Sequence, residues 1–306
     1  MNTLPARVFI SIFIVGEQLM FGLFDAIGDW FRGLLIDGIM NNFTGMFNEV
    51  NSKVEEIALN VGQTPAGWNA GIFGLIRTIS NTVIIPIAGM ILTFILTYEL
   101  IHMVIEKNNM HDFDTFIIFK WIFKTFVAVY ILTHTFDIVM GVFGLAQNVV
   151  NGSANIIQGS LNMQLALAHL EAQLADMGFG ALLGLWLQSS ILSLAMSIMS
   201  LCIFIIIYGR MIEIYLTISV APIPFSTMVN RDWGSIGNGY LKALFALAFQ
   251  GFLIMICVAI YAILLQQATM AADIHAAIWG CAGYTVLLCF TLFKTGSMSR
   301  SIFGAH

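Results

Sequence analysis

The sequence contains little charge for its length. Lysine and arginine contribute 12 residues and aspartate and glutamate 17, so charged residues make up only 9% of the 306 positions. Soluble domains carry about 25% charged residues, and this chain cannot cover a core with a comparable water-facing surface. Apolar residues reach 59%, and the mean hydropathy is +0.90. These values predict a chain embedded in a bilayer, where the outer surface can be apolar.

The sequence also lacks the motifs of common catalytic and metal sites. It has no Gly-rich phosphate loop with lysine, no His-Glu-x-x-His and no cysteine pair at zinc spacing, and its six histidines are scattered. With a net charge of −5 and no basic cluster, it does not indicate a nucleic-acid-binding surface. The four cysteines all fall in apolar stretches: Cys202, Cys257, Cys281 and Cys289. They indicate buried or lipid-facing thiols, so we predict neither an enzyme nor a cofactor or metal site.

Long apolar runs are what the sequence has in abundance. A helix needs about 20 mostly apolar residues to span the hydrocarbon, and these runs are continuous instead of alternating. We predict an all-α polytopic protein with about five spans, at residues 82–103, 125–146, 181–208, 241–265 and 274–293. The apolar run 214–225 is too short to cross, because twelve helical residues cover only about 18 Å. Pro222 and Pro224 interrupt it, so it is predicted to be a broken or re-entrant element.

The region before the first span differs from the rest. Residues 20–80 are predicted to form an external amphipathic region, with a helix over 20–47 that lies in the interface or packs on partner subunits, or else is a short core helix. Residues 48–70 and 147–162 are rich in polar residues and are predicted to be connections, and 165–177 to be a second short amphipathic helix. Because Gly16-Glu17 can be encoded by a sequence resembling a ribosome-binding site, we expect translation to begin at Met20 and residues 1–19 to be a mis-annotated start.

The distribution of lysine and arginine predicts the orientation. Basic residues flank the first and third connections and the end of the chain: Lys107, Lys120, Lys124, Arg210, Arg231, Lys242, Lys294 and Arg300. The second connection, Gln147–Gly178, and the fourth, Gln266–Asp273, contain none. Since basic residues mark cytoplasmic loops, the N-terminus is predicted outside and the C-terminus inside. Counting 214–225 as a sixth span would break this alternation.

Among the ionisable residues in or near the predicted spans, five are candidates for a functional role: Glu99, His134, Asp137, Arg210 and Glu213. Charge inside a membrane is costly and usually faces protein or water. Glu99 is predicted to be either an interfacial carboxylate or a partner of Lys120 or Lys124. The His134 and Asp137 pair either fixes packing, lines a hydrated path or binds a neighbouring subunit. Arg210 and Glu213 have the spacing of a one-turn ion pair.

One region combines a double proline, an Arg-Asp-Trp motif and the start of an apolar helix. The stretches are Ala221–Phe225 with Pro222 and Pro224, Asn230–Gly234 with Arg231 and Trp233, and Tyr240–Phe252. They resemble the TrbL-like polytopic inner-membrane subunit of type IV secretion systems, in the subfamily found on conjugative elements of Gram-positive bacteria. The opening Met20–Asp25 resembles the start of that subfamily, so the resemblance extends over nearly the whole chain from Met20 onward.

The resemblance implies a function that the composition alone does not. It implies a non-enzymatic component of a conjugation channel with about five spans, an external N-terminus and a cytoplasmic C-terminus. It also implies ring assembly, partner subunits and ATPases, and a transient contact of Gln147–Gly178 with single-stranded DNA. That segment has no basic residue, so tight phosphate binding is not expected. The alternatives are a small-molecule transporter or permease, or a phage-type pore former; an intramembrane enzyme is the weakest.

Overall fold

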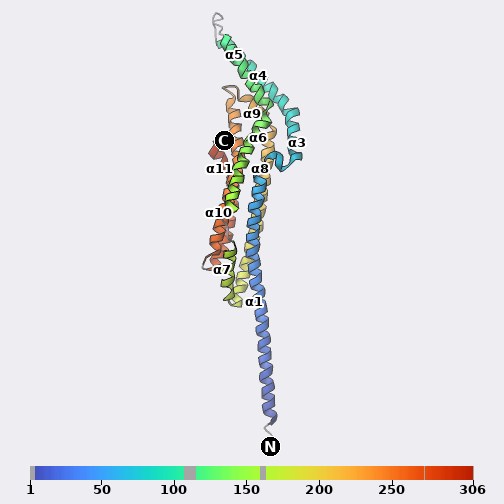
Figure 1. Ribbon diagram of the computed structural model, residues 1–306, viewed down its shortest axis with the longest axis vertical. Coiled ribbons are helices and arrows are strands. Elements are labelled where there is room, and N and C mark those ends of the chain that lie inside the picture. Colours follow the sequence, from blue (N-terminus) through green and yellow to red (C-terminus); the bar gives the residue numbers. More distant parts are fainter. Residues whose placement is uncertain (1–3, 107–114, 159–162, 272, 306) are drawn as a thin grey trace. The chain divides into compact units, whose positions relative to one another are not determined.

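The computed structural model describes residues 4–106, 115–158, 163–271 and 273–305, and these ranges contain helices and no strand. For residues 4–25, and for several residues near the gaps, the structure describes the backbone but not the side chains. The helices, shown in Figure 1, are α1 Leu4–Val61, α2 Pro65–Trp68, α3 Ala70–Ile79, the π-helix η1 Ser80–Ile84, α4 Ile85–Glu106, α5 Thr115–Thr133, α6 Thr135–Gln158, α7 Met163–Ala175, α8 Phe179–Ser219, α9 Pro222–Thr227, α10 Gly234–Thr269 and α11 Ile274–Phe303. The all-α prediction is confirmed.

Four or five segments are long and apolar enough to cross a membrane. Four are the continuous helical segments Ala70–Ile105, Phe179–Ser219, Gly234–Ala268 and His275–Phe303. The fifth is a bent pair, Ile118–Thr133 with Thr135–Ser153, whose axes differ by 65°. The number agrees with the predicted five spans. Each predicted span overlaps one of these segments over its whole length, except that 274–293 begins one residue earlier and 125–146 contains the bend.

The bend between α5 and α6 lies at His134 and keeps its backbone hydrogen bonds. The His134 N–H donates to the Tyr130 carbonyl at 3.0 Å, and the Ile138 N–H donates to the His134 carbonyl at 3.1 Å. The imidazole Nδ1 lies 3.0 Å from the Tyr130 carbonyl oxygen, and the two rings stack with centroids 4.2 Å apart. Backbone N–H and C=O groups that lack hydrogen bonds cost free energy in hydrocarbon. A bend that keeps these hydrogen bonds is therefore compatible with a membrane-spanning pair.

Two predicted connections are wrong because the helices before them continue. Helix α1 runs through 48–61 and ends where Gly62 precedes the Thr64-Pro65 start of α2. The Thr64 hydroxyl accepts the Gly67 N–H at 3.2 Å, which caps α2. Helix α6 likewise runs to Gln158, because asparagine, glycine and serine lower helix propensity without removing a backbone donor as proline does. Residues 107–114 of the connection between the first two predicted spans lie outside the described residues, and the structure does not test whether translation begins at Met20.

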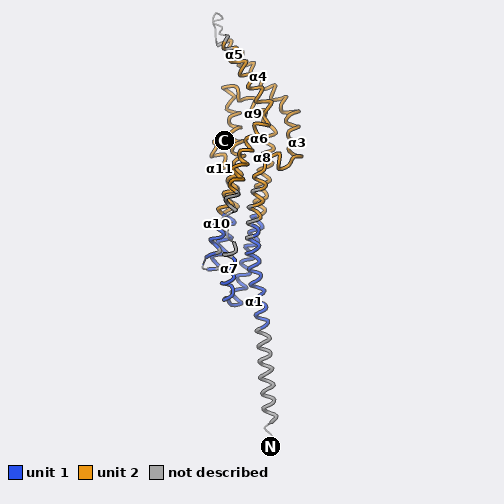
Figure 2. Tube along the Cα trace, viewed as in Figure 1, with its two compact units in different colours: residues 1–51, 161–199, 261–286 blue, residues 52–160, 200–260, 287–306 orange. Residues whose placement is uncertain are grey.

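The chain divides into two compact units, coloured separately in Figure 2. Unit 1 comprises residues 1–51, 161–199 and 261–286, and unit 2 comprises 52–160, 200–260 and 287–306. The main core of unit 2 joins side chains of α6, α8, α9 and α10, including Phe143, Ile218, Phe225 and Leu244. A smaller core in unit 2 joins α4 and α5 through Ala88, Leu92, Leu96, Ala128 and Leu132.

Many large apolar side chains remain exposed in the structure. On α5, a helical stripe of four phenylalanines is between 62% and 67% exposed: Phe116, Phe119, Phe123 and Phe126. Such a stripe would be unfavourable in water, whereas lipid tails or another membrane helix can cover it. The chain is therefore a multi-pass membrane protein.

Candidate functional site

The predicted broken element lies in unit 2 between the end of α8 and the start of α10. Helix α8 ends at Ser219, and Pro222 begins the six-residue helix α9. Pro222 and Pro224 are both buried, together with Phe225, Ser226 and Thr227. Residues 214–219 continue α8, and the chain turns only after Ser219, where the two prolines follow. The predicted broken element over 214–225 is therefore wrong in its first half, and the break itself lies at residues 220–227.

The turn after α9 is fixed by one asparagine side chain. Asn230 Oδ1 accepts the backbone N–H groups of Asp232 at 2.8 Å and Trp233 at 3.2 Å. The Asn230 carbonyl also accepts the Gly234 N–H at 2.8 Å, where α10 begins. These bonds satisfy donors at the start of the helix, as an N-cap residue does. Arg231 and Trp233 are both exposed, and the Trp233 ring lies 6.1 Å from that of Phe94 on α4.

Helices α9 and α10 approach each other so closely that a glycine is required. A Cβ placed on Gly237 would lie 2.6 Å from the Pro224 carbonyl oxygen and would overlap the Met228 side chain. Tyr240, one turn later, donates its hydroxyl to the Thr217 carbonyl of α8 at 3.0 Å. The short helix is therefore held between α8 and α10 by close backbone packing and a side-chain hydrogen bond.

Arg210 is a buried cation on α8. Its side chain is 5% exposed, and its guanidinium donates to the carbonyls of Leu247 at 3.3 Å and Ala248 at 3.2 Å on α10. Its Nη1 atom has no hydrogen-bond partner among the described residues. A Cβ on Gly251 would lie 3.1 Å from Nη2, so this glycine leaves the space that the guanidinium fills.

The prediction that Glu213 forms a one-turn ion pair with Arg210 is wrong. Glu213 forms its ion pair with Arg300 on α11, and Arg210 is held by the α10 carbonyls described above. Sequence spacing suggested the local pair, whereas the observed partner lies 87 residues further along the chain. In the sequence, Arg300 was recognised only as one of the basic residues at the end of the chain, and no partner was predicted for it.

Helices α10 and α11 are also joined by polar contacts that the sequence did not predict. The Ser299 hydroxyl donates to the Ala246 carbonyl at 2.5 Å, and both residues are buried. Gln250 Nε2 lies 3.5 Å from the Thr295 hydroxyl oxygen, and a Cβ on Gly296 would lie 3.3 Å from the same amide nitrogen. Small residues and hydroxyls at a helix contact are typical of packing within membranes. The spacing of Gly296 and Ser299 is the only sequence signal for this contact.

Glu99 and Lys124 form an ion pair between α4 and α5. Lys124 is one of the two partners that the sequence suggested for this carboxylate. The side chains are 31% exposed for Lys124 and 21% for Glu99, and Glu99 Oε2 has no hydrogen bond in the described residues. Trp121 Nε1 donates to the Leu96 carbonyl at 3.3 Å, one turn from the pair. The pair therefore joins α4 to α5.

We expect the Glu99–Lys124 pair to be worth about 1 kcal/mol when measured as a coupling. Lys124→Met should lower the free energy of unfolding because it leaves a half-buried carboxylate without its partner. Adding Glu99→Gln should recover part of that loss, since the unpaired charge is then gone. The measurement is a double-mutant cycle on detergent-solubilised protein. Additive effects of the two substitutions would contradict an energetic role for the pair.

The predicted pairing of His134 with Asp137 has a different geometry. His134 contacts Tyr130 and the Thr133 hydroxyl, which lies 3.1 Å from its Nδ1 atom. Asp137 is exposed in the first turn of α6, where a negative charge stabilises the helix terminus. The four cysteines are free thiols, and the described residues contain no cluster of three or more possible metal ligands. The candidate site is therefore a set of side-chain contacts that join neighbouring helices, together with the broken element between α8 and α10.

Long apolar helices, a broken element between two spans and ionic groups used for helix contacts together define a polytopic membrane subunit. A family model described as "TrbL/VirB6 plasmid conjugal transfer like protein" matches residues 50–222, which is more than half of the chain. The chain therefore belongs to the TrbL/VirB6 family. No match was found among curated proteins or among solved structures. The matched range ends at Pro222, so most of the double-proline and Arg-Asp-Trp region lies beyond it.

Proposed function

We propose that this protein is a non-enzymatic channel or scaffold component of a conjugal DNA transfer machine, a type IV secretion system. The observation that carries the proposal is the family match across residues 50–222. The helix contacts described above support a scaffold, because Arg210, Glu213 and Glu99 are used to join helices. The Gram-positive conjugative-element subfamily is the more specific form of this proposal, based on the resemblance of residues 219–252.

The partners in this proposal are other secretion subunits, the ATPases that supply energy and further copies of the chain in a ring. Exposed apolar helix faces such as the α5 phenylalanine stripe offer contact area for such neighbours. Contact with single-stranded DNA would be transient, because Gln147–Gly178 contains no lysine or arginine to neutralise phosphates. The described parts of that segment are helical, in α6 and α7.

The proposed orientation has the N-terminus outside and the C-terminus in the cytoplasm, as the distribution of basic residues favours. A reporter enzyme fused after Ser153, in α6, should be active only outside the membrane. A fusion after Gly234, at the start of α10, should be active only in the cytoplasm. Matched fusions to reporters active on opposite sides provide the control. Two fusions reading the same side would contradict the five-span arrangement.

The function is tested by deleting the gene and measuring transfer between donor and recipient cells. We expect transfer to fall to the background of a donor that lacks the conjugation ATPase, and to return when the gene is supplied in trans. Transfer at the parental frequency in the deletion strain would reject the proposed role. A substrate uptake defect without a transfer defect would favour a permease.

A further inference from the structure

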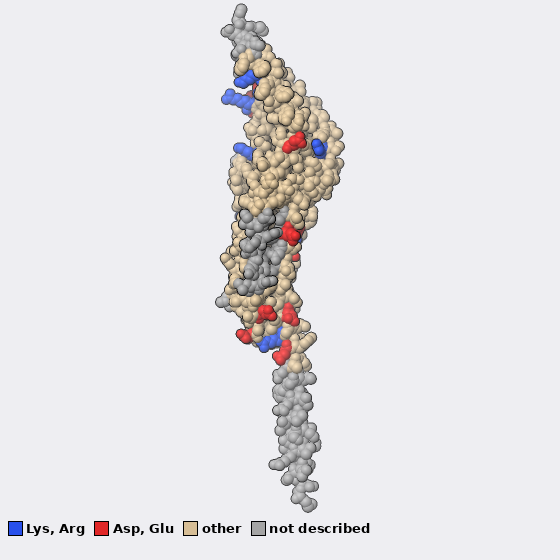
Figure 3. Space-filling model, viewed as in Figure 1, with Lys and Arg blue, Asp and Glu red and all other residues tan. Residues whose placement is uncertain are grey.

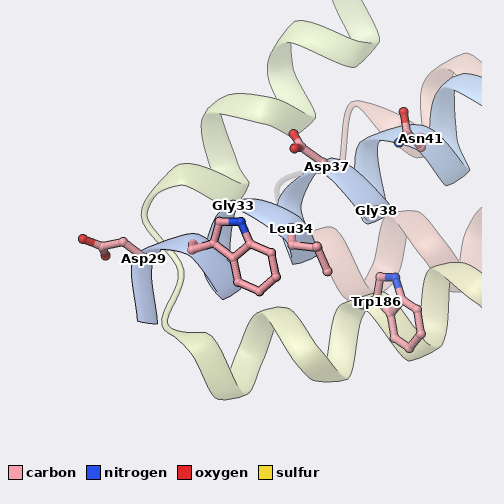
Figure 4. Close-up of a pocket in the computed structure, with 8 residues that line it drawn as sticks. Asp29, Gly33, Leu34, Asp37, Gly38, Asn41 and Trp186 are labelled. Atoms are coloured by element: carbon pink, nitrogen blue, oxygen red, sulfur yellow. The ribbon is translucent and has the colours of Figure 1, made fainter. Parts of the chain in front are cut away.

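Unit 1 contains a groove between α1 and α8 that the proposed function leaves without an occupant. Its volume is about 530 Å³. Seven of the residues that line it lie on α1, and one lies on α8: Asp29, Trp30, Gly33, Leu34, Asp37, Gly38, Asn41 and Trp186. Figure 4 shows the carboxylates of Asp29 and Asp37 carried by α1, and the Trp186 indole carried by α8. The groove therefore combines aromatic walls with two acidic groups.

Two glycines shape the groove in different ways. A Cβ on Gly38 would lie 2.7 Å from the Trp186 indole Nε1, so the absence of a side chain at Gly38 lets this ring pack directly on the backbone of α1. A Cβ on Gly33 would meet no atom within 4 Å, and this glycine is exposed. A helix that lacks a side chain at such a position offers a notch where another chain can approach closely.

The walls of the groove expose large apolar side chains. Trp30 is 63% exposed, Leu34 is 52% exposed and Trp186 is 38% exposed. Exposed tryptophans beside a notch are typical of binding surfaces, where aromatic residues provide most of the energy. The described ring faces of Trp30 and Trp186 can also attract a cation.

The electrostatic environment is acidic. Asp29 and Asp37 are exposed and lie two turns apart on α1, about 12 Å along the helix axis. The one described lysine or arginine of unit 1, Arg32, donates to the carbonyl of Ala175, the last residue of α7, at 2.5 Å. The other described charges of this unit are acidic: Glu49, Glu171, Asp176 and Asp273. Figure 3 shows acidic side chains gathered beside basic atoms in the part of the chain that Figure 2 colours as unit 1.

We propose that this groove binds a basic amphipathic segment of a partner protein. The partner's lysine or arginine side chains would pair with Asp29 and Asp37, and an apolar side chain would enter the notch at Gly33. An anionic bilayer surface does not fit, because its phosphates would meet the two carboxylates. A second copy of this chain docked through the same face would bring like charges together. The existence of a partner rests on the proposed role as a secretion subunit, whereas binding by the groove can be measured without it.

The test uses the full chain in nanodiscs of zwitterionic phosphatidylcholine and a fluorescent helical peptide built from lysine and leucine. Fluorescence anisotropy measures binding, with empty nanodiscs subtracted and a glutamate–leucine peptide as the negative probe. Asp29→Lys with Asp37→Lys should weaken binding by about tenfold or more, because attraction becomes repulsion. The control, Glu55→Lys with Asp232→Lys, makes the same change in net charge on exposed residues of unit 2 and should bind within about twofold of the wild type.

A second pair of variants tests the notch. Gly33→Leu should weaken binding by about tenfold because it fills the space into which the partner would fit. Gly28→Leu is matched to it, since Gly28 is also exposed, would have no atom within 4 Å of an added Cβ and does not line the groove. Both variants should unfold at the wild-type temperature or slightly above it, because leucine favours a helix over glycine.

Three results would overturn the proposal. The first is wild-type binding by the groove variants, and the second is equal weakening by the control pairs. The third is displacement of the peptide by dissolved short-chain phosphatidylcholine, which would assign the groove to a lipid headgroup. Mating assays test the secretion role separately from the groove. Loss of transfer on gene deletion, together with no peptide binding by the wild type, would reject only the proposed binding by the groove. Peptide binding with normal transfer in the deletion strain would reject only the secretion role.

Discussion

Gly237→Ala is expected to lower the free energy of unfolding by about 2–3 kcal/mol. The added methyl group would lie 2.6 Å from the Pro224 carbonyl oxygen and would overlap the Met228 side chain. The backbone oxygen cannot rotate away, so α9 and α10 would have to separate. Elsewhere in a helix the same substitution is favourable, because alanine has the higher helix propensity. The sign of the effect therefore reports the close packing of the broken element.

The measurement is thermal unfolding in detergent, followed with a dye that becomes fluorescent on reacting with thiols. Buried Cys281 makes the chain suitable for this assay without added labels. Gly239→Ala is the control, because Gly239 lies on the same helix, is exposed and has no atom within 4 Å of the added methyl group. It should be neutral or stabilising by up to about 1 kcal/mol. Equal stability of the two variants would show that α9 does not pack on α10 as described.

The charge reversal Arg210→Glu is expected to have the largest effect, a loss of about 3–5 kcal/mol or failure to yield monodisperse protein. The new carboxylate would face the carbonyl oxygens of Leu247 and Ala248, where the guanidinium now donates, and would lie one turn from Glu213. It would be a buried anion with no donor. Arg210→Met should cost much less, since it removes the charge while the two carbonyls still lie within helix α10.

Arg300→Glu serves as the control for Arg210→Glu. Arg300 also interacts with Glu213, but its side chain is 56% exposed, so reversal should cost about 1 kcal/mol or less. Protein yield, gel-filtration profile and the thiol-reactive melting curve provide the readouts. If Arg210→Met proves as damaging as Arg210→Glu, packing of the long side chain would account for the role of Arg210. Wild-type stability of Arg210→Glu would contradict its burial.

The arrangement of helices could be predicted from the sequence because membrane spans depend on length and polarity, both of which are local. The break near Pro222 and Pro224 was anticipated, since prolines remove backbone donors that a continuous helix needs, but residues 214–219 of the predicted run belong to α8 and to the candidate span Phe179–Ser219. The connections at 48–61 and 147–158 were wrong for the opposite reason. Their polar residues and glycines only weaken a helix, and tertiary packing determines whether it continues.

The site was predicted less completely because its contacts join distant parts of the chain. Glu99 and Lys124 lie near the ends of consecutive predicted spans, so the sequence could offer Lys124 as one possible partner of Glu99. The Glu213–Arg300 pair was not, because the spacing of Arg210 and Glu213 offered a local partner first. The need for Gly237 and the contact of Gly38 with Trp186 depend on how closely two helices approach. Neither the periodicity nor the composition of the sequence specifies how closely two helices approach each other.

The 65° bend at His134 has a consequence for the lipids around the protein. If α6 follows the bilayer normal, the 19 residues of α5 rise only about 12 Å, less than half of the hydrocarbon thickness of about 30 Å. The helix and its four exposed phenylalanines then occupy a single leaflet. Added cross-sectional area in one leaflet favours curvature, so a circle of such subunits would deform the membrane at its rim.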